Sequence, residues 1–273
     1  MSIIFYNQLY FYCNLNLLLV SLIKLRLHWT LNMETVFFIS DIHIGAGTKI
    51  EEKEKFDRLT SFFNYINQPG NQLYIVGDLF DFWFEYKHVV CNQYFQTLFR
   101  IHQLIENNVK VHFLPGNHDS WTRNFFSEQV KIIMHPEILT SEIQSKKVFI
   151  FHGDGISNKD TGYRMLKRIF RNPINISLYR LLHPDLGIPI AKLMAMGSRK
   201  HTSGKKFNDQ KDYINFAVEK FNLGFDYVIV GHSHKPVYKK FGNHVLLNLG
   251  DWIHNFSYGK LEGGNLMLNY WNS

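Results

Sequence analysis

Hydrophobic residues in this 273-residue chain gather into six short runs that have the length and composition of buried strands. Most of the runs are rich in β-branched or aromatic residues and end at Gly, Asp, Asn or His, which is typical of strands that finish in a turn. The runs are Val36–Ser40, Leu73–Val76, Val109–Leu114, Val148–Phe151, Tyr227–Val230 and Val245–Leu249.

Between the runs, apolar residues recur at three- and four-residue steps, which is the spacing of one face of a helix. The three clearest sets are Phe56, Leu59, Phe63 and Ile66; Tyr94, Leu98, Ile101 and Ile105; and Tyr213, Phe216, Ala217 and Phe221. Strands that alternate with helices predict an α/β domain with a buried sheet. Ligands of such domains bind beyond the carboxyl ends of the strands, so the residues after each run are the first candidates for a site.

The segment 155–206 interrupts this alternation and predicts an inserted helical cap. It is rich in Leu, Ile and Met, and Pro173, Pro184 and Pro189 are expected to divide it into short helices. It holds eleven Lys and Arg against two Asp, a net charge of +9 in a chain whose formal total is +7, so the remainder carries −2. This concentration of positive charge indicates a polyanionic partner: a nucleic acid, a nucleotide or an anionic membrane.

The length suits one large domain with an insertion, which we place at residues 33–273. Residues 1–32 include the apolar stretch Leu15–Ile23, which is short for a membrane span and lacks the features of a signal peptide. We interpret residues 1–32 as an extension upstream of the true start at Met33; a peripheral anchor and a structural element are the alternatives. The two cysteines have no paired spacing, which argues against a disulfide framework and fits a reducing compartment.

Five polar blocks follow the apolar runs and carry the candidate chemistry. They are Asp41-Ile42-His43, Gly77-Asp78, Gly116-Asn117-His118-Asp119, His152-Gly153-Asp154 and Gly231-His232-Ser233-His234. Carboxylate, amide and imidazole groups are ligands of divalent Mn, Fe and Zn, and two cations that share a carboxylate can clamp a phosphate and activate a water. Each block alone has an ordinary explanation as a turn, a helix cap or a pair of loop histidines. All five in order at strand ends favour a metal-dependent hydrolase of phosphate esters or anhydrides.

Three blocks contain residues with distinct expected roles. Side chains at i and i+2 share a face of an extended chain, so Asp41 and His43 can bind one metal. His118 cannot easily face the same way as Asn117, so we expect His118 to point at the substrate, with Asp119 orienting its imidazole. We expect Asp154 to support a turn.

The five blocks resemble those of the calcineurin-like metallophosphoesterase superfamily over residues 35–252. This resemblance implies a four-layer αββα sandwich with two divalent metals, which we expect to be Mn²⁺, at the strand ends. It implies that His118 stabilises the transition state or protonates the leaving oxygen. The implied ligands of one metal are Asp41, His43, Asp78 and His234, and those of the other are Asp78, Asn117, His152 and His232.

A narrower resemblance rests on Gly77–Trp83, on His152-Gly153-Asp154 with a later Asp160, and on a helical cap before Gly231–Pro236. These features are similar to the UDP-2,3-diacylglucosamine diphosphatase family of lipid A biosynthesis. The resemblance implies cleavage of a UDP-sugar lipid to UMP and diacylglucosamine 1-phosphate (lipid X). The chain departs from the proteobacterial members, which have Arg where it has His118. By positional match, contacts to the UDP portion are expected from Asn117, Asp160, Ser198, Arg199 and Lys205.

The cap suits this narrower interpretation because a diacylated substrate needs an apolar groove, here from residues such as Leu181, Leu182 and Leu193. Its Lys and Arg residues would contact the nucleotide and hold the enzyme peripherally on the cytoplasmic face of an anionic inner membrane. The alternative is that the apolar residues only pack the cap onto the body.

Three other functions compete with this one. A nuclease or phosphodiesterase would use the basic segment for nucleic acid, but the basic residues are interleaved with aliphatic residues more than with stacking aromatic residues, so no nucleic-acid partner is expected. A protein phosphatase leaves the apolar cap unexplained. A non-catalytic binding module should have broken ligand blocks, and none is broken.

Overall fold

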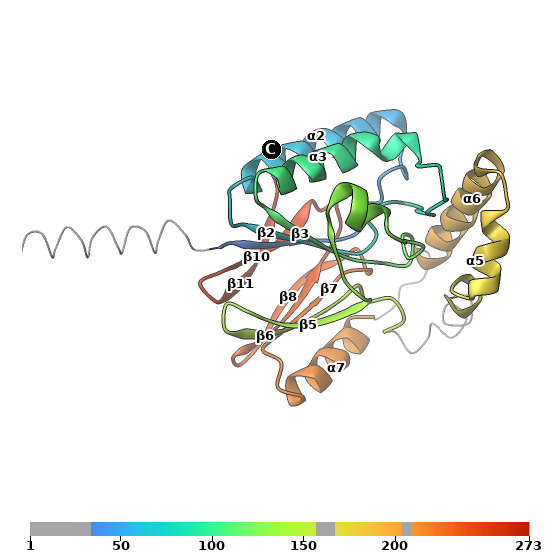
Figure 1. Ribbon diagram of the computed structural model, residues 1–273. Helices are drawn as coiled ribbons and strands as arrows, with labels where there is room; N and C mark the ends of the chain where they lie inside the picture. The colour runs from blue at the N-terminus through green and yellow to red at the C-terminus, as the bar shows by residue number, and fades with distance from the viewer. Residues whose placement is uncertain (1–33, 157–166, 204–208, 273) are drawn as a thin grey trace, which may run out of the picture. The chain divides into compact units, whose positions relative to one another are not determined.

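Two β-sheets form the centre of the part of the chain that the structure describes, residues 34–156, 167–203 and 209–272 of a computed structural model (Figure 1). The interpretation of residues 1–32 lies outside these ranges. The first sheet has the strand order β11-β10-β1-β2-β3-β4 and the second has the order β5-β6-β7-β9-β8. The first contains β1 (Val36–Ile39), β2 (Gln72–Val76), β3 (Lys110–Leu114), β4 (Ile133–Met134), β10 (Ser257–Glu262) and β11 (Asn265–Tyr270). The second contains β5 (Ile138–Ile143), β6 (Lys146–Phe151), β7 (Tyr227–Val230), β8 (Pro236–Phe241) and β9 (His244–Leu249).

The six predicted runs are the parallel strands of these sheets. Strands β1, β2 and β3 are parallel neighbours in the first sheet, and β6, β7 and β9 are parallel neighbours in the second. Parallel strands end at the same edge of their sheet, so each sheet delivers the segments that follow its strands to one edge.

The alternation of side chains along each strand produces the layers. On β1, Val36 and Phe38 belong to an apolar cluster shared with Ile150 of β6 and Ile229 of β7, so this cluster lies between the sheets. The neighbouring residue Phe37 belongs instead to a cluster shared with the helices outside the first sheet. These helices are α2 (Lys49–Ile66) and α3 (Phe95–Glu106), the latter preceded by the 3₁₀ turn η1 (Asn92–Tyr94).

A third cluster covers the outer face of the second sheet, where Tyr213 and Ala217 of α7 (Asp209–Asn222) pack against Phe149 and Val228. The order of layers is therefore helix, sheet, sheet, helix, which confirms the αββα sandwich expected from the resemblance. A short π-helical turn, η2 (Phe126–Val130), adds to the outer face of the first sheet.

Two helices occupy the segment in which a cap is expected, α5 (Pro173–Arg180) and α6 (Pro184–Ser203). Proline stands at the first position of each helix, where its missing N–H costs nothing, and the Asn172 side chain caps α5 by accepting from Ile174 N. The expected break at Pro189 is wrong, because this proline lies inside α6. It is near the start of the helix, so only one intrahelical hydrogen bond is lost.

The inward faces of α5 and α6 pack on aromatic residues of the body. Ile176 and Tyr179 of α5 and Ile188 of α6 contact a cluster that contains Phe82 and Phe84. Tyr179 Oη donates to the Gly187 carbonyl at 2.6 Å, which ties the two helices together. None of the helices in the described ranges has the length and hydropathy needed to cross a bilayer.

Candidate metal centre

The five polar blocks meet at the carboxyl ends of the parallel strands. Asp41 and His43 follow β1, Asp78 follows β2, and Asn117 follows β3 in the first sheet. The second sheet supplies His152 after β6, and His232 with His234 after β7. The structure therefore brings together all seven predicted ligands, which the chain separates by up to 193 positions.

Five of these residues adopt left-handed backbone conformations, with φ between 48° and 67°. They are Asp41, His43, Asp78, His232 and His234. Such conformations are unfavourable for residues with a side chain and persist only where surrounding contacts enforce them, commonly at functional sites. Backbone hydrogen bonds between the turns after β1 and β2 hold Asp41, His43 and Asp78, since Asp41 N donates to Gly77 O and His43 N to Asp78 O. His232 is held by its own N–H, which donates to Asp41 Oδ2.

Glycines let the turns approach the candidate ligands closely. A side chain at Gly116 would collide with the carboxylate of Asp78, and one at Gly231 would collide with Ser40 and Asp41. The small residue before Asn117 and before His232 is therefore required by the packing of the site.

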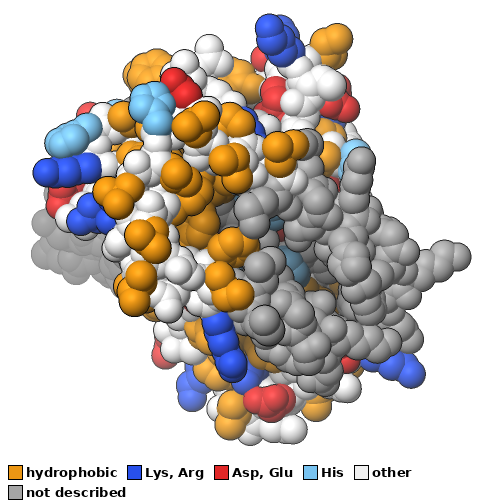
Figure 2. Space-filling model, turned by 90° about the vertical axis from the view of Figure 1, so that its right-hand side faces the viewer, with side chains coloured by type: hydrophobic (Ala, Val, Ile, Leu, Met, Phe, Trp, Pro, Cys, Tyr) orange, Lys and Arg blue, Asp and Glu red, His pale blue; other side chains and the backbone are white. Residues whose placement is uncertain are grey.

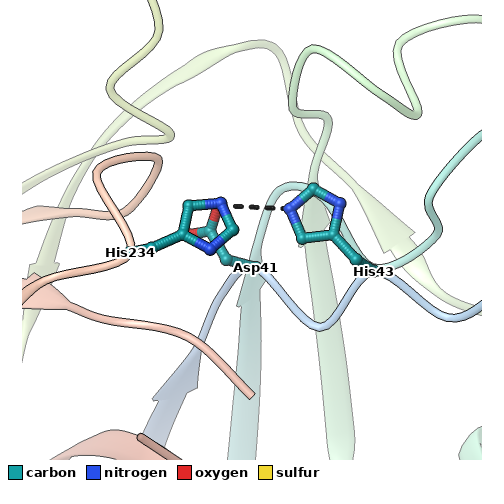
Figure 3. A group of neighbouring side chains, drawn as sticks. All are labelled: Asp41, His43 and His234. Atoms are coloured by element: carbon teal, nitrogen blue, oxygen red, sulfur yellow. Dashed lines mark ion pairs between the residues drawn. The ribbon is translucent and has the colours of Figure 1, made fainter. Parts of the chain in front are cut away.

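Asp41, His43 and His234 form one group of potential ligands (Figure 3). Asp41 Oδ1 lies 3.7 Å from His43 Nε2 and 3.5 Å from His234 Nε2, and the two imidazole rings stack with centroids 5.0 Å apart. The other carboxylate oxygen, Asp41 Oδ2, accepts a hydrogen bond from His232 N at 2.8 Å and lies 2.6 Å from Ser40 Oγ. One oxygen thus fixes the carboxylate and the other faces the imidazoles.

Asp78, His152 and His232 form a second group, which Asn117 joins. Asp78 Oδ2 lies 3.3 Å from His152 Nε2, and Asn117 Oδ1 lies 3.1 Å from the same nitrogen. Asp78 Oδ2 is also 3.6 Å from His43 Nε2 of the first group, whereas Asp78 Oδ1 accepts from His118 N at 2.9 Å. Asp78 therefore lies between the groups, in the place expected of a shared carboxylate.

The donor atoms fit divalent cations. Asp41 Oδ1 and His43 Nε2 are buried and make no hydrogen bond. His152 Nδ1 lies 2.9 Å from the Val76 carbonyl while its Nε2 faces two oxygens, and a neutral imidazole has only one N–H for these three acceptors. A cation facing Nε2 removes the conflict, and mixed O and N ligands suit Mn²⁺, Fe²⁺ or Zn²⁺.

Electrostatics keep the two central carboxylates ionised. Burial raises the pKa of both Asp41 and Asp78, but neighbouring imidazoles outweigh it: His234 lowers the pKa of Asp41, and His152 and His118 hold the pKa of Asp78 well below its usual value. Ionised carboxylates are the form that binds metal.

His118 lies beside the metal-facing atoms, in a third group of potential ligands with His43 and Asp81. Its Nδ1 lies 2.7 Å from the Asp81 carbonyl, to which it donates, so Nε2 is the nitrogen left for a substrate. Its ring meets that of His43 edge-on at 4.8 Å. Burial is the main cause of a His118 pKa lowered to about 4, so the free imidazole is neutral at neutral pH.

The expected role of Asp119 in orienting His118 is wrong. Asp119 is fully buried, and its carboxylate accepts from backbone N–H groups of the turns after β2 and β3: Gly116 at 2.8 Å, Leu79 at 2.7 Å and Asp78 at 3.2 Å. A buried carboxylate needs several donors, and these amides supply them. Burial and the charge of Asp78 raise the Asp119 pKa to about 7. Asp119 therefore holds the two ligand-bearing turns together.

The expected UDP contacts are only partly placed. Asn117 lies in the second group, while Ser198 and Arg199 belong to α6 with side chains outside the described part of the structure. Asp160 and Lys205 lie outside the described residues. Asp154 is buried, and its Oδ2 accepts a hydrogen bond from Lys167 Nζ at 2.6 Å; its expected support of a turn stays a prediction.

Two aspartates at the site were not singled out from the sequence. Asp81 contacts the His118 ring through its carbonyl and faces His43 Nδ1 with its carboxylate at 3.7 Å. Asp251, after β9, lies 3.4 Å from His234 Nδ1. Burial raises the Asp251 pKa, but hydrogen bonds from His234 and from backbone amides outweigh it and lower that pKa strongly. Asp251 carried the same signal as Asp78, a Gly-Asp directly after a predicted strand.

Comparison with known proteins agrees with this geometry. The calcineurin-like phosphoesterase family model matches residues 34–236. A protein of Porphyromonas gingivalis named UDP-2,3-diacylglucosamine hydrolase is 30% identical over 251 residues, covering 85% of this chain and 96% of the relative. A protein of the same name from Hahella chejuensis is 26% identical over 239 residues, covering 85% and 95%. The chain therefore belongs to the calcineurin-like phosphoesterase family of metal-dependent hydrolases.

Proposed function

We propose that this protein hydrolyses the pyrophosphate of UDP-2,3-diacylglucosamine, releasing UMP and 2,3-diacylglucosamine 1-phosphate, in lipid A biosynthesis. The observation that carries the proposal is an intact set of ligands for two cations, shared through Asp78, next to an apolar aromatic surface. The names of relatives that cover most of the chain support the same substrate.

The proposed ligands are Asp41, His43, Asp78 and His234 for one ion and Asp78, Asn117, His152 and His232 for the other. Two bound divalent cations, with Mn²⁺ as our choice, would neutralise phosphate charge and lower the pKa of a water molecule. The chain itself fixes the orientation of each ligand: Ser40 and His232 N hold Asp41, and His118 N holds Asp78.

His118 is proposed to act on the substrate. Its Nδ1 donates a hydrogen bond to the Asp81 carbonyl. Nε2 is therefore the nitrogen that can contact a diphosphate oxygen. The negative charge of a bound diphosphate raises the His118 pKa from its low value and favours a proton on Nε2. That proton can stabilise the transition state or be donated to the leaving oxygen.

The acyl chains have an apolar surface beside this centre. A narrow cleft lined by Phe82, Phe84, Tyr86 and Ile188 has a volume of about 10 Å³, so it would have to widen to admit an acyl chain. The segment from Asp81 to Phe84 joins the cleft to the centre, because Trp83 N donates to the His118 carbonyl at 3.0 Å. We propose that this cleft, between α6 and the body, receives part of the lipid.

We further propose that the outer face of α5 and α6 rests on an anionic membrane surface. Exposed apolar residues recur at helical spacing: Ile174 and Leu178 on α5, Leu181 directly after it, and Leu186, Ile190 and Leu193 on α6. Figure 2 shows hydrophobic side chains gathered on this face, with Lys and Arg at its margin. Leu181 is 83% exposed and Leu193 is 64% exposed, so these residues face away from the body and suit a bilayer better than the groove expected of them.

The decisive experiment is incubation of the Mn²⁺-loaded protein with UDP-2,3-diacylglucosamine, with UMP release as the readout. UDP-monoacylglucosamine, UDP-N-acetylglucosamine and single-stranded DNA serve as competing substrates. We expect the diacylated sugar to have the highest kcat/KM, because only it fills the apolar cleft. Efficient cleavage of DNA without UMP release from the lipid would refute the proposal in favour of a nuclease.

A further inference from the structure

Asp251 has two carboxylate oxygens with different tasks. Oδ1 accepts from the backbone N–H groups of Ile253, His254 and Asn255 at 3.1, 2.8 and 2.9 Å. Oδ2 faces His234 Nδ1 at 3.4 Å. The carboxylate is 2% exposed, so the loop after β9 fixes it in place.

His234 depends on such a partner more than His152 does. The His152 side chain is fully buried, and its Nδ1 is held by a backbone carbonyl. The His234 side chain is 34% exposed, and Nε2 already points toward Asp41 Oδ1 at 3.5 Å. Apart from the stacked ring of His43, the contact on the far side of the His234 ring is Asp251.

We propose that Asp251 is a positioning residue that sets the tautomer of His234, with the proton on Nδ1 and the lone pair on Nε2, which faces the cation site. A carboxylate can only accept, so it requires a proton on Nδ1, and a neutral imidazole then carries its lone pair on Nε2. The inference rests on the proposed role of His234 as a metal ligand. It assigns control of the His234 tautomer to Asp251, a residue outside the five blocks.

Asp251→Asn tests the proposal because it replaces one acceptor oxygen of the carboxylate with a hydrogen-bond donor and keeps the other oxygen. The three backbone N–H groups require an oxygen where Oδ1 now lies, so the new amide nitrogen must take the place of Oδ2. That nitrogen donates to His234 Nδ1, which forces the proton to Nε2 and blocks the atom that faces the cation. The loop keeps its three hydrogen bonds.

The first readout is the tautomer of His234 in metal-free protein that carries Asp41→Ala, because the Asp41 carboxylate faces Nε2 at 3.5 Å and would otherwise compete for the proton. Long-range ¹H–¹⁵N NMR correlations, assigned with the variant His234→Asn, report the tautomer. The Asp41→Ala protein should show an Nδ1–H tautomer, and the added substitution Asp251→Asn should change it to Nε2–H. An Nε2–H tautomer in the Asp41→Ala protein overturns the proposal, whatever the double variant does.

The second readout is Mn²⁺ binding by isothermal titration. Asp251→Asn should weaken one of two sites by about 10- to 100-fold, the usual effect of losing a partner of a metal-binding histidine, and leave the other unchanged. Asn255→Ala is the matched control, since Asn255 Nδ2 donates to the His234 carbonyl at 3.1 Å in the same loop without touching the imidazole.

Equal weakening by Asn255→Ala, or wild-type affinity at both sites in Asp251→Asn, would show that the loop and not the carboxylate matters. Neither readout involves a substrate. Failure of this inference therefore leaves the proposed lipid substrate untouched, and failure of the substrate assignment leaves this inference standing.

Discussion

At the scale of single residues, Asp78 is the side chain on which both ligand groups depend. Its Oδ2 is within 3.6 Å of an imidazole nitrogen from each group. We predict that Asp78→Ala lowers hydrolysis by more than about 10²-fold, because it removes the shared charge of the centre. It should also reduce the number of Mn²⁺ ions bound, measured by elemental analysis of the purified protein.

His232→Ala is predicted to have a more limited effect on metal, since His232 belongs to the second group alone. One ion should remain, while hydrolysis is lost. Asp226→Asn is a suitable control because this aspartate accepts a backbone hydrogen bond from Lys147 far from the centre. Unchanged metal content with full activity in Asp78→Ala would disprove the assigned site.

A different outcome is expected for His118, whose Nδ1 donates to a backbone carbonyl and whose Nε2 is the nitrogen proposed to meet the substrate. His118→Ala should keep both ions and lower kcat by roughly 10²- to 10⁴-fold, the range of acid–base assistance. Steady-state kinetics and metal content on the same preparation measure both effects. Loss of an ion in this variant would mean that His118 is a ligand.

Sequence reasoning could find residues whose role depends on their own block, and it missed those whose role depends on a distant partner. The seven candidate ligands were predicted because each follows an apolar run. Asp81 and Asp251 act on His118 and His234, which are 37 and 17 positions away, and only the fold makes these pairs visible. Asp119 was assigned to its neighbour His118, although its true partners include Leu79, across the turn after β2.

At the scale of elements, α5 and α6 each have an inward and an outward apolar stripe. We predict that the triple variant Leu178→Ser, Leu186→Ser, Leu193→Ser binds vesicles containing phosphatidylglycerol at least tenfold more weakly, because each buried leucine contributes about 1.5–3 kcal/mol. Hydrolysis of a small soluble phosphodiester should not change, since the ligands follow strands and not these helices. Vesicle sedimentation and a chromogenic assay measure the two properties.

The control for this prediction is Ile50→Ser with Leu223→Ser, two exposed apolar residues on other elements. These substitutions should leave vesicle binding intact. Equal loss of binding in the control, or none in the triple variant, would mean that the outward stripes do not contact lipid.

The elements themselves were predictable where their pattern is strong. All six continuous apolar runs are strands. The missed strands include edge strands of mixed polarity: β5 alternates exposed and partly buried residues, β8 contains Lys239 and Lys240, and β11 has Leu266 as its one buried residue. Such strands are stabilised by pairing with a neighbouring strand and not by their own apolar content, so no local sequence pattern predicts them.

At the scale of the whole molecule, the centre joins the two sheets. The first sheet supplies Asp41, His43, Asp78 and Asn117, and the second supplies His152, His232 and His234. We predict that removal of metal with EDTA lowers the thermal unfolding midpoint and that Mn²⁺ restores it. An ion present at 100 times its Kd adds about 2.7 kcal/mol, which corresponds to a shift of about 5–10 °C for a domain of this size.

Differential scanning calorimetry with and without Mn²⁺ measures this shift. Asp78→Ala should show little dependence on Mn²⁺, because the shared ligand is absent. A wild-type midpoint that does not respond to metal would contradict a centre that links the sheets.

The apolar layer between the sheets sets the spacing of the two halves of the centre, although it contains no ligand. Side chains such as Phe38, Val76 and Ile150 act as spacers there. A smaller side chain at one of these positions lets the sheets slide or close by a fraction of an ångström, and a metal site tolerates little change in ligand distance. In a genetic screen for loss of function, inactivating substitutions should therefore fall in this apolar layer between the sheets as well as at the candidate ligands.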